Sequence, residues 1–295
     1  MKRVGIVGTG TMGRTVAAKF LENGVKANGY DVSPACVEKG RVAGISMCPS
    51  LAELAGSSDW IILFLPGPAE IAECVCGEEG LLSALPAGAI IIDMCTSSPE
   101  NTGVMESAAR AMGVHYIDAP VLGRPASVGK WALPVGGHPS ALEDVRALLQ
   151  FIAAHVVHMG GPGSGHRVKL LNQLMFGAIN AMTAEMMAVS ERVGIPPAKL
   201  YEIITASQAG TVSNLFRELG RRVSEERYTD PTFTVSLLCK DVRLGVEMAE
   251  AAGAPLILGR TIDFLNKASR AQGYGAEDSA VMWHCVKNFW KEQES

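Results

Sequence analysis

A glycine-rich segment near the start of the chain, residues 8–13 (GTGTMG), constrains the fold more than any other feature. It follows a short apolar run and opens a stretch with amphipathic helical spacing. Glycines at its first, third and sixth positions, between a strand and a helix, form a dinucleotide-binding fingerprint. Gly8 allows the tight turn, Gly10 lets a pyrophosphate approach the backbone, and Gly13 lets the helix lie close to the strand. The alternative is an ordinary glycine-rich turn.

Apolar runs of strand length recur along the first half of the chain, separated by polar and alanine-rich segments of helical length. Continuous apolar runs indicate strands buried on both faces, and this alternation is typical of a doubly wound parallel sheet. We therefore expect an α/β fold whose first domain, residues 1–162, is a Rossmann-type dinucleotide-binding domain. The expected strands are Val4–Val7, Val25–Tyr30, Trp60–Leu65, Ala89–Ile92 and Val114–Ile117, with Trp131–Val135 and Val156–Met159 extending the sheet.

The pattern changes in the second half. Residues 167–193 contain no proline and many Leu, Met and Ala residues, which predicts one long, largely buried helix that joins the two domains. The rest of the second domain, residues 163–295, is helical in pattern. It carries too much apolar surface to stand alone in water, so a homodimer or homotetramer is expected. Its apolar side chains include Met175, Met182, Met187 and Leu238.

Composition narrows the class of partner. The 295 residues carry 26 Lys and Arg against 30 Asp and Glu, which indicates no nucleic-acid surface. The apolar runs are far shorter than the roughly 20 residues that cross a bilayer, so no membrane partner is expected. The seven cysteines form no Cys-x-x-Cys pair and no zinc-finger spacing, so we expect neither a metal site nor disulfides. A cytoplasmic protein that acts on a small molecule fits best.

Asp31 ends the second expected strand, eighteen residues after Gly13. A carboxylate here accepts hydrogen bonds from the adenosine ribose hydroxyls and repels a 2′-phosphate. No Arg or Lys occurs at residues 32–35, so NAD is favoured as the cofactor. Arg14 and Lys39 leave NADP open, and an Asp that merely starts a turn is the alternative.

Further short motifs follow along the chain. They are Leu65-Pro66, Asp93-Met94-Cys95-Thr96, Asp118-Ala119-Pro120-Val121, Gly163-x-Gly165-x-x-x-Lys169-x-x-Asn172 and Lys240-Asp241. Together with the glycine loop and its Met12, they resemble the β-hydroxyacid dehydrogenases over essentially the whole chain. That family includes 3-hydroxyisobutyrate dehydrogenase, tartronate semialdehyde reductase and sulfolactaldehyde reductase.

The resemblance implies roles for these motifs. Lys169 would be catalytic, since an ammonium close to a carbonyl oxygen polarises and protonates it during reduction, and neutral lysine takes the alcohol proton during oxidation. Asn172, on the same helix face, would bond the substrate oxygen. The expected cofactor-binding residues are Gly8, Gly10, Thr11, Met12, Gly13, Asp31, Leu65, Pro66, Thr96, Lys240 and Asp241.

The role of Lys169 requires a lowered pKa, because a free lysine titrates at about 10.4. Partial burial would lower it, and so would a second cation, for which Lys240 is the candidate. The alternatives are a solvated lysine at a helix start and, for Lys240-Asp241, an ordinary surface pair. No histidine is given a catalytic role, and only His166, near the helix start, could sense the site.

The chain departs from the family just after Val121. Most relatives continue with Ser-Gly-Gly, whose backbone N–H groups hold the substrate carboxylate, whereas this chain has Leu122, Gly123, Arg124 and Pro125. A guanidinium binds a carboxylate or sulfonate through two parallel hydrogen bonds. Leu122, Gly123 and Arg124 are therefore expected to bind a strongly anionic substrate, unless Arg124 pairs with an acidic residue and braces the loop.

The sequence thus predicts an NAD-dependent oxidoreductase. It would transfer hydride between the nicotinamide cofactor and a small anionic β-hydroxy acid or its semialdehyde. An imine reductase and a non-catalytic nucleotide-sensing module on the same fold are the alternatives. The spacing of Lys169 and Asn172 argues against both.

Overall fold

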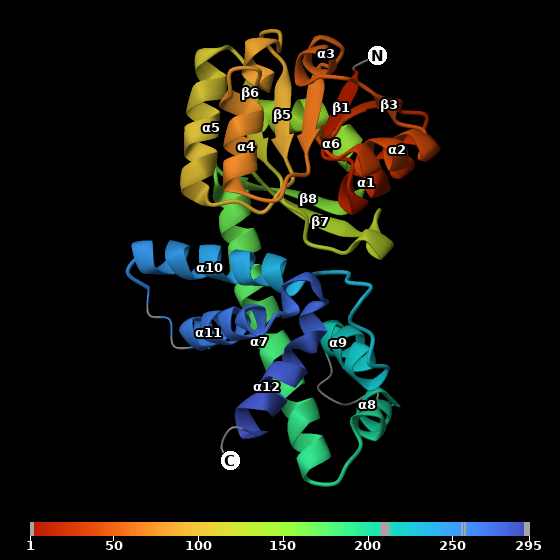
Figure 1. The fold of residues 1–295 in the computed structure, drawn as a ribbon. Helices are drawn as coiled ribbons and strands as arrows, with labels where there is room; N and C mark the ends of the chain where they lie inside the picture. The colour runs from red at the N-terminus through yellow and green to blue at the C-terminus, as the bar shows by residue number, and fades with distance from the viewer. Residues whose placement is uncertain (1–2, 207–212, 255, 257, 292–295) are drawn as a thin grey trace. The chain divides into compact units, whose positions relative to one another are not determined.

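The computed structural model describes residues 3–206, 213–254, 256 and 258–291. The chain divides into two compact units, Met1–Lys169 and Leu170–Ser295. The first is an α/β unit built on one sheet, and the second is helical (Figure 1). Helix α7 (Ser164–Arg192) begins in the first unit and continues into the second. It begins three residues earlier than the sequence pattern predicts.

The first unit holds an eight-stranded sheet in the order β3-β2-β1-β4-β5-β6-β7-β8. Its first six strands are parallel, β7 runs antiparallel to β6, and β8 runs parallel to β7. The expected doubly wound sheet is therefore confirmed. The strands are β1 (Val4–Val7), β2 (Ala27–Tyr30), β3 (Ser46–Met47), β4 (Trp60–Leu63), β5 (Ile90–Asp93), β6 (His115–Asp118), β7 (Trp131–Gly136) and β8 (Ala153–Gly160).

Both faces of this sheet are buried because successive apolar residues of a strand point to opposite sides. Ile6 packs in one hydrophobic cluster with α1 (Thr11–Glu22) and α6 (Pro139–Leu149). Its neighbour Val7 packs in the other cluster. That second cluster includes side chains of α3 (Leu51–Gly56), α4 (Pro68–Cys76) and α5 (Pro99–Ala111), of which α4 and α5 lie side by side in Figure 1. Helix α2 (Pro34–Val42) packs beside β3.

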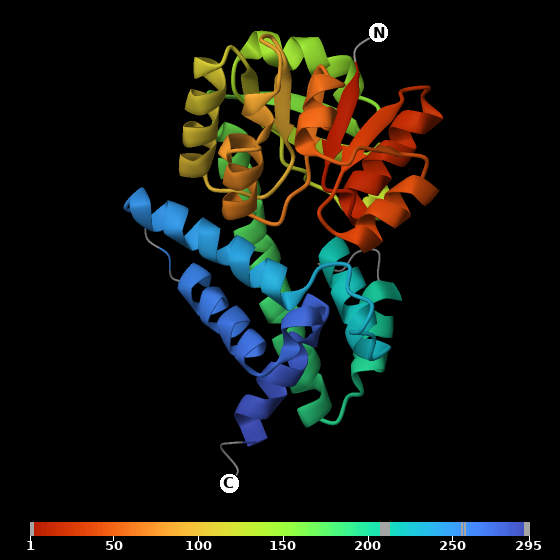
Figure 2. The same cartoon turned by 45° about the horizontal axis from the view of Figure 1, so that its top comes forward.

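The second unit packs helices in pairs around the rest of α7. Helices α8 and α9 lie side by side, as do α10 and α11, in both views (Figures 1 and 2). Met187 and Leu238 are fully buried within this unit, so the expectation that they belong to its outer apolar surface is wrong. The helices are α8 (Pro197–Ala206), α9 (Asn214–Ser224), α10 (Val235–Ala251), α11 (Leu258–Ala271) and α12 (Met282–Lys291).

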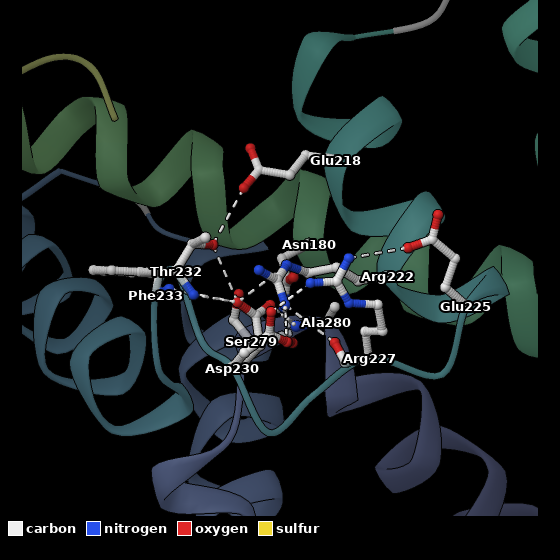
Figure 3. A network of polar contacts seen from close by, with 11 residues as sticks. Asn180, Glu218, Arg222, Glu225, Arg227, Asp230, Thr232, Phe233, Ser279 and Ala280 are labelled. Atoms are coloured by element: carbon white, nitrogen blue, oxygen red, sulfur yellow. Dashed lines mark hydrogen bonds and ion pairs between the residues drawn. The ribbon is translucent and has the colours of Figure 1, made fainter. Parts of the chain in front are cut away.

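A buried ion pair ties together the loops of this unit. The Arg222 guanidinium lies 3.5 Å from the Asp278 carboxylate, and both side chains are almost fully buried. Arg222 also donates to the carbonyl of Arg227, and both residues are labelled in Figure 3. Asp278 accepts from the Thr232 backbone N–H. Because a buried pair of this kind is costly to break from one side, it holds α9 against the turn before α12. The Thr232 contact ties the segment before α10 to the same carboxylate. Among the described residues, no helix is long and apolar enough to cross a membrane.

Candidate active site

The expected cofactor-binding residues of the first unit follow the carboxyl ends of neighbouring parallel strands. The glycine loop follows β1, Asp31 follows β2, Leu65 and Pro66 lie after β4, and Thr96 lies after β5. Strand order reverses between β1 and β4, because the chain continues to one side of β1 with β2 and returns on the other with β4. Ligands of doubly wound sheets bind at such a switch point.

Packing explains two of the three loop glycines. Gly8 has a φ of +88°, and a Cβ there would lie 2.2 Å from the Phe64 carbonyl oxygen. A Cβ on Gly13 would lie 2.0 Å from the Gly8 carbonyl oxygen. Gly10 differs, because its φ is −60° and a Cβ there would meet no atom of the described residues within 4 Å. Neither the fold nor the backbone angle requires glycine at position 10, which fits a backbone that a pyrophosphate approaches.

The Asp31 carboxylate also braces the loop. One oxygen accepts from the Thr9 backbone N–H at 2.7 Å, and the other accepts from the Ser33 N–H at 2.9 Å. A carboxylate oxygen accepts more than one hydrogen bond, so this bracing is compatible with bonds to ribose hydroxyls. Arg14 donates to the Thr9 carbonyl at 2.6 Å, and with Lys39 it lines a groove of about 570 Å³ between α1 and α2.

Buried polar groups hold the loops after β4 and β5. Leu65 donates its backbone N–H to the Cys95 sulfur at 3.0 Å, and Cys95 donates its own N–H to Asp93 at 2.9 Å. Tyr116 donates its hydroxyl to the same carboxylate at 2.7 Å, and burial followed by the Asp93 charge raises the pKa of Tyr116 well above its usual value. These contacts position Leu65 and the half-buried Thr96.

Asp118 connects the motif at residues 118–121 to the motif at residues 163–172. Its carboxylate accepts from the backbone N–H groups of Gly163 and His166, both at 2.8 Å, and so caps the start of α7 from the end of β6. A Cβ on Gly165 would lie 2.9 Å from this carboxylate and 2.7 Å from the Asp118 carbonyl oxygen. Burial raises the pKa of Asp118, against the lowering effect of His166 and the two N–H groups. Glycine at position 165 therefore lets the helix approach the strand.

Lys169 lies one turn later on α7. Its Nζ donates to the Val121 backbone carbonyl at 2.9 Å, and its side chain is half-buried. A solvated lysine at the helix start was the alternative, and this geometry does not match it. Asp118 thus fixes the start of the helix, and the carbonyl three residues further along the chain orients the Lys169 ammonium.

The unusual loop after Val121 is tightly braced. Leu122 pairs with Ala132, and the Trp131 indole N–H donates to the Arg124 carbonyl at 2.8 Å. Trp131 is fully buried. A Cβ on Gly123 would lie 2.1 Å from the Trp131 ring, so the loop follows this path only with glycine there.

The second unit connects the remaining expected residues in one chain of contacts. Lys240 Nζ lies 2.8 Å from one Asp241 oxygen, and Gln173 donates to the other at 2.6 Å. Asn172 donates to the Gln173 side-chain oxygen at 3.3 Å. Asp241 is almost fully buried, so Lys240-Asp241 is not an ordinary surface pair. Gln173 was missed by the sequence analysis, although its place next to Asn172 was a usable signal.

The comparisons with known proteins agree with this architecture. Residues 3–161 match the family model "NAD binding domain of 6-phosphogluconate dehydrogenase", and residues 163–286 match "NAD-binding of NADP-dependent 3-hydroxyisobutyrate dehydrogenase". L-Threonate dehydrogenase of Escherichia coli K12 is 30% identical over 284 residues, 95% of this chain and 93% of that protein. The 3-sulfolactaldehyde reductase of the same organism is 28% identical over 290 residues, covering 96% and 95% respectively.

A solved structure shows the same fold. The crystal structure of 3-hydroxyisobutyrate dehydrogenase from Salmonella typhimurium matches with a TM-score of 0.89 and 27% identity, covering 96% of this chain and 99% of that one. The chain belongs to the β-hydroxyacid dehydrogenase family. It is an NAD(P)-dependent hydroxyacid dehydrogenase.

Proposed function

We propose that this enzyme transfers hydride between NAD(H) and a small anionic β-hydroxy acid or its semialdehyde, with Lys169 as the general acid and base. The bound cofactor supplies or accepts the hydride at its nicotinamide ring. Gly8, Gly10 and Gly13 hold its pyrophosphate, together with Thr11 and Met12. The other residues proposed to contact it are Asp31, Leu65, Pro66, Thr96, Lys240 and Asp241.

The observation that carries this proposal is the hydrogen bond from Lys169 Nζ to the Val121 carbonyl. It gives a half-buried ammonium a fixed direction beside the loop at residues 122–125. An ammonium held this way can donate a proton to a substrate oxygen during reduction, and the neutral amine can accept it during oxidation. Asn172, three residues later on the helix, orients the same oxygen.

We propose that Leu122, Gly123 and Arg124 form the binding site for the substrate's anionic group. The contacts of Trp131 fix the backbone of Arg124, so its guanidinium is presented from a rigid loop. Replacing Arg124 with Ala should raise the KM for an anionic semialdehyde roughly ten- to a hundredfold, since a charged hydrogen bond contributes about 1.5–3 kcal/mol. An unchanged KM across several anions would rule out this role.

The cofactor preference follows from Asp31. A carboxylate that already braces the loop stays close to the adenosine ribose and repels a 2′-phosphate, so NADH is expected to be preferred over NADPH. Arg14 and Lys39 are the groups that would favour NADPH. We also propose that the enzyme is cytoplasmic. The seven cysteines support this location, because none of them forms a disulfide.

A screen of NADH oxidation tests the proposed function. The purified enzyme is assayed with semialdehydes that carry a carboxylate, a sulfonate or a phosphonate, and the series is repeated with NADPH. We expect turnover of at least one anionic semialdehyde, preference for NADH, and no turnover of a cyclic imine. Turnover of the imine alone would refute the proposal.

We also propose that the enzyme is a homodimer or homotetramer. Leu171, Met175, Met182 and Met186 are spaced by four, seven and four residues on α7, which places them on one face, and each is exposed. An apolar stripe of this length is typical of a subunit interface. Met182→Glu should lower the mass measured by light scattering, whereas the neighbouring Glu185→Gln should not; a monomeric wild-type enzyme would contradict the proposal.

A further inference from the structure

A buried histidine lies one helical turn before Lys169, and the hydride-transfer scheme does not use it. The His166 side chain is fully buried, as are the carboxylates of Asp93 and Asp118. His166 Nε2 lies 3.8 Å from an Asp93 oxygen, and its Nδ1 lies 3.9 Å from an Asp118 oxygen. The ring therefore stands between two acidic groups that come from the ends of β5 and β6.

The hydrogen bonds around both carboxylates match what an ionised carboxylate accepts. Asp93 accepts from the Cys95 N–H through one oxygen and from the Tyr116 hydroxyl through the other. Asp118 likewise accepts a backbone N–H on each oxygen. An ionised carboxylate accepts on both oxygens, so all four of these donors are satisfied in that form. Two buried negative charges need a compensating cation, and among the described residues His166 is the basic side chain paired with both.

Each ring nitrogen of His166 lies within hydrogen-bond distance of an oxygen that can accept. Nε2 lies 3.3 Å from the Cys95 carbonyl oxygen, which can only accept. Nδ1 lies 2.7 Å from the Thr102 hydroxyl, and that hydroxyl donates to the Ser98 carbonyl at 3.1 Å. When Thr102 gives its only proton to Ser98, Nδ1 must donate to Thr102. That arrangement places a proton on each ring nitrogen, whereas a Thr102 hydroxyl that donates to Nδ1 leaves the ring neutral. The two facing carboxylates favour the doubly protonated ring, because an opposite charge nearby stabilises the charged form.

We propose that His166 is a positioning residue for Lys169, acting as a buried imidazolium shared by Asp93 and Asp118. The inference rests on the proposed role of Lys169. The imidazolium compensates Asp118 while that carboxylate caps the first turn of α7, and it bonds to the loop after β5 and to α5. The helix start is thereby fixed against the strand ends, and Lys169 meets the Val121 carbonyl one turn later.

The protonation state is tested directly by nitrogen NMR of the full-length enzyme labelled with ¹⁵N-histidine. The chain has six histidines, and the His166 signals are identified by their loss in the His166→Gln variant. If the His166→Gln variant is insoluble, variants of the other five histidines identify the His166 signals by elimination. We expect the shift pattern of two protonated nitrogens at pH 7.5. A pattern with one protonated and one unprotonated nitrogen would overturn the proposal, whatever the activity of the enzyme.

The positioning role is tested by kinetics. For His166→Gln we expect kcat per NADH-binding site to fall roughly ten- to a hundredfold, with the dissociation constant of NADH within about twofold, because a displaced acid costs rate rather than cofactor affinity. The deuterium isotope effect with NADH labelled at the transferred position should rise as the chemical step becomes limiting. A merely structural loss of folded enzyme leaves the isotope effect unchanged.

His158→Gln is the matched control, since His158 is an exposed histidine of the same unit, and its kcat and isotope effect should stay at the wild-type values. Unchanged values in His166→Gln would overturn the positioning role. If Lys169→Ala retained full turnover, the proposed function would fail instead, and the NMR result would still report on the buried imidazolium. The two failures are therefore distinguishable.

Discussion

Replacing Asp118 with Asn tests whether one buried carboxylate holds the start of α7. The two side chains have nearly the same shape, but an amide offers one acceptor oxygen where the carboxylate offers two. One of the two N–H groups that now donate at 2.8 Å would then face an NH₂ group. The lost charged hydrogen bond costs about 1.5–3 kcal/mol, and the orphaned buried N–H costs about 1–3 kcal/mol.

Part of this loss is offset, because the substitution also removes a buried charge whose desolvation raises the pKa of Asp118. A net destabilisation of about 2–4 kcal/mol remains. For a unit of this size it corresponds to a fall in Tm of roughly 4–16 °C. Differential scanning calorimetry measures the fall. Glu143→Gln on the surface of α6, which breaks only an exposed pair with Arg146, is the control and should leave the Tm unchanged. A Tm of Asp118→Asn equal to that of the control would refute the reasoning.

Three further predictions concern single side chains. Gly10→Ala should keep the wild-type Tm yet raise the NADH dissociation constant at least about tenfold, because only a ligand needs the space at that backbone; unchanged NADH affinity in a fluorescence titration would contradict this. Tyr116→Phe should lower the free energy of unfolding in urea by about 1–3 kcal/mol, since Asp93 loses a buried donor, and a change too small to measure would count against it. Iodoacetamide at pH 8 should label the exposed Cys76 but not the buried Cys74, whose pKa burial raises to about 12, and peptide mass spectrometry showing the reverse order would be inconsistent with the structure.

Much of the sheet could be predicted because buried parallel strands leave continuous apolar runs in the sequence. Residues 4–7 form β1 as expected, and Trp131–Gly136 extends the sheet from the expected start. The two-residue strand Ser46–Met47 was not predicted, because a polar pair too short for periodicity carries no local signal. Helix α7 begins at residue 164 because Asp118 satisfies its first N–H groups, and a contact between such distant residues leaves no local trace.

In the candidate site, too, contacts between residues distant in the sequence could not be predicted. The spacing of Gly163, Gly165 and Lys169 could be recognised as a motif, but its cause could not, since Asp118 and the Val121 carbonyl come from another part of the chain. Trp131 could be placed at the start of a strand from the sequence. Its bond to the Arg124 carbonyl depends on how the loop at residues 122–131 folds back, which no periodicity describes.

Lys169→Ala, assayed in a single turnover with enzyme in excess over NADH, tests the central claim most directly. General acid catalysis contributes about 10²–10⁴-fold, so hydride transfer to an anionic semialdehyde should slow by that factor while NADH binding stays within about twofold of wild type. Added methylammonium should restore part of the rate. Lys130→Ala, an exposed lysine of the same unit, should behave as wild type. Hydride transfer at the wild-type rate in Lys169→Ala would contradict the assignment of Lys169 as the acid and base.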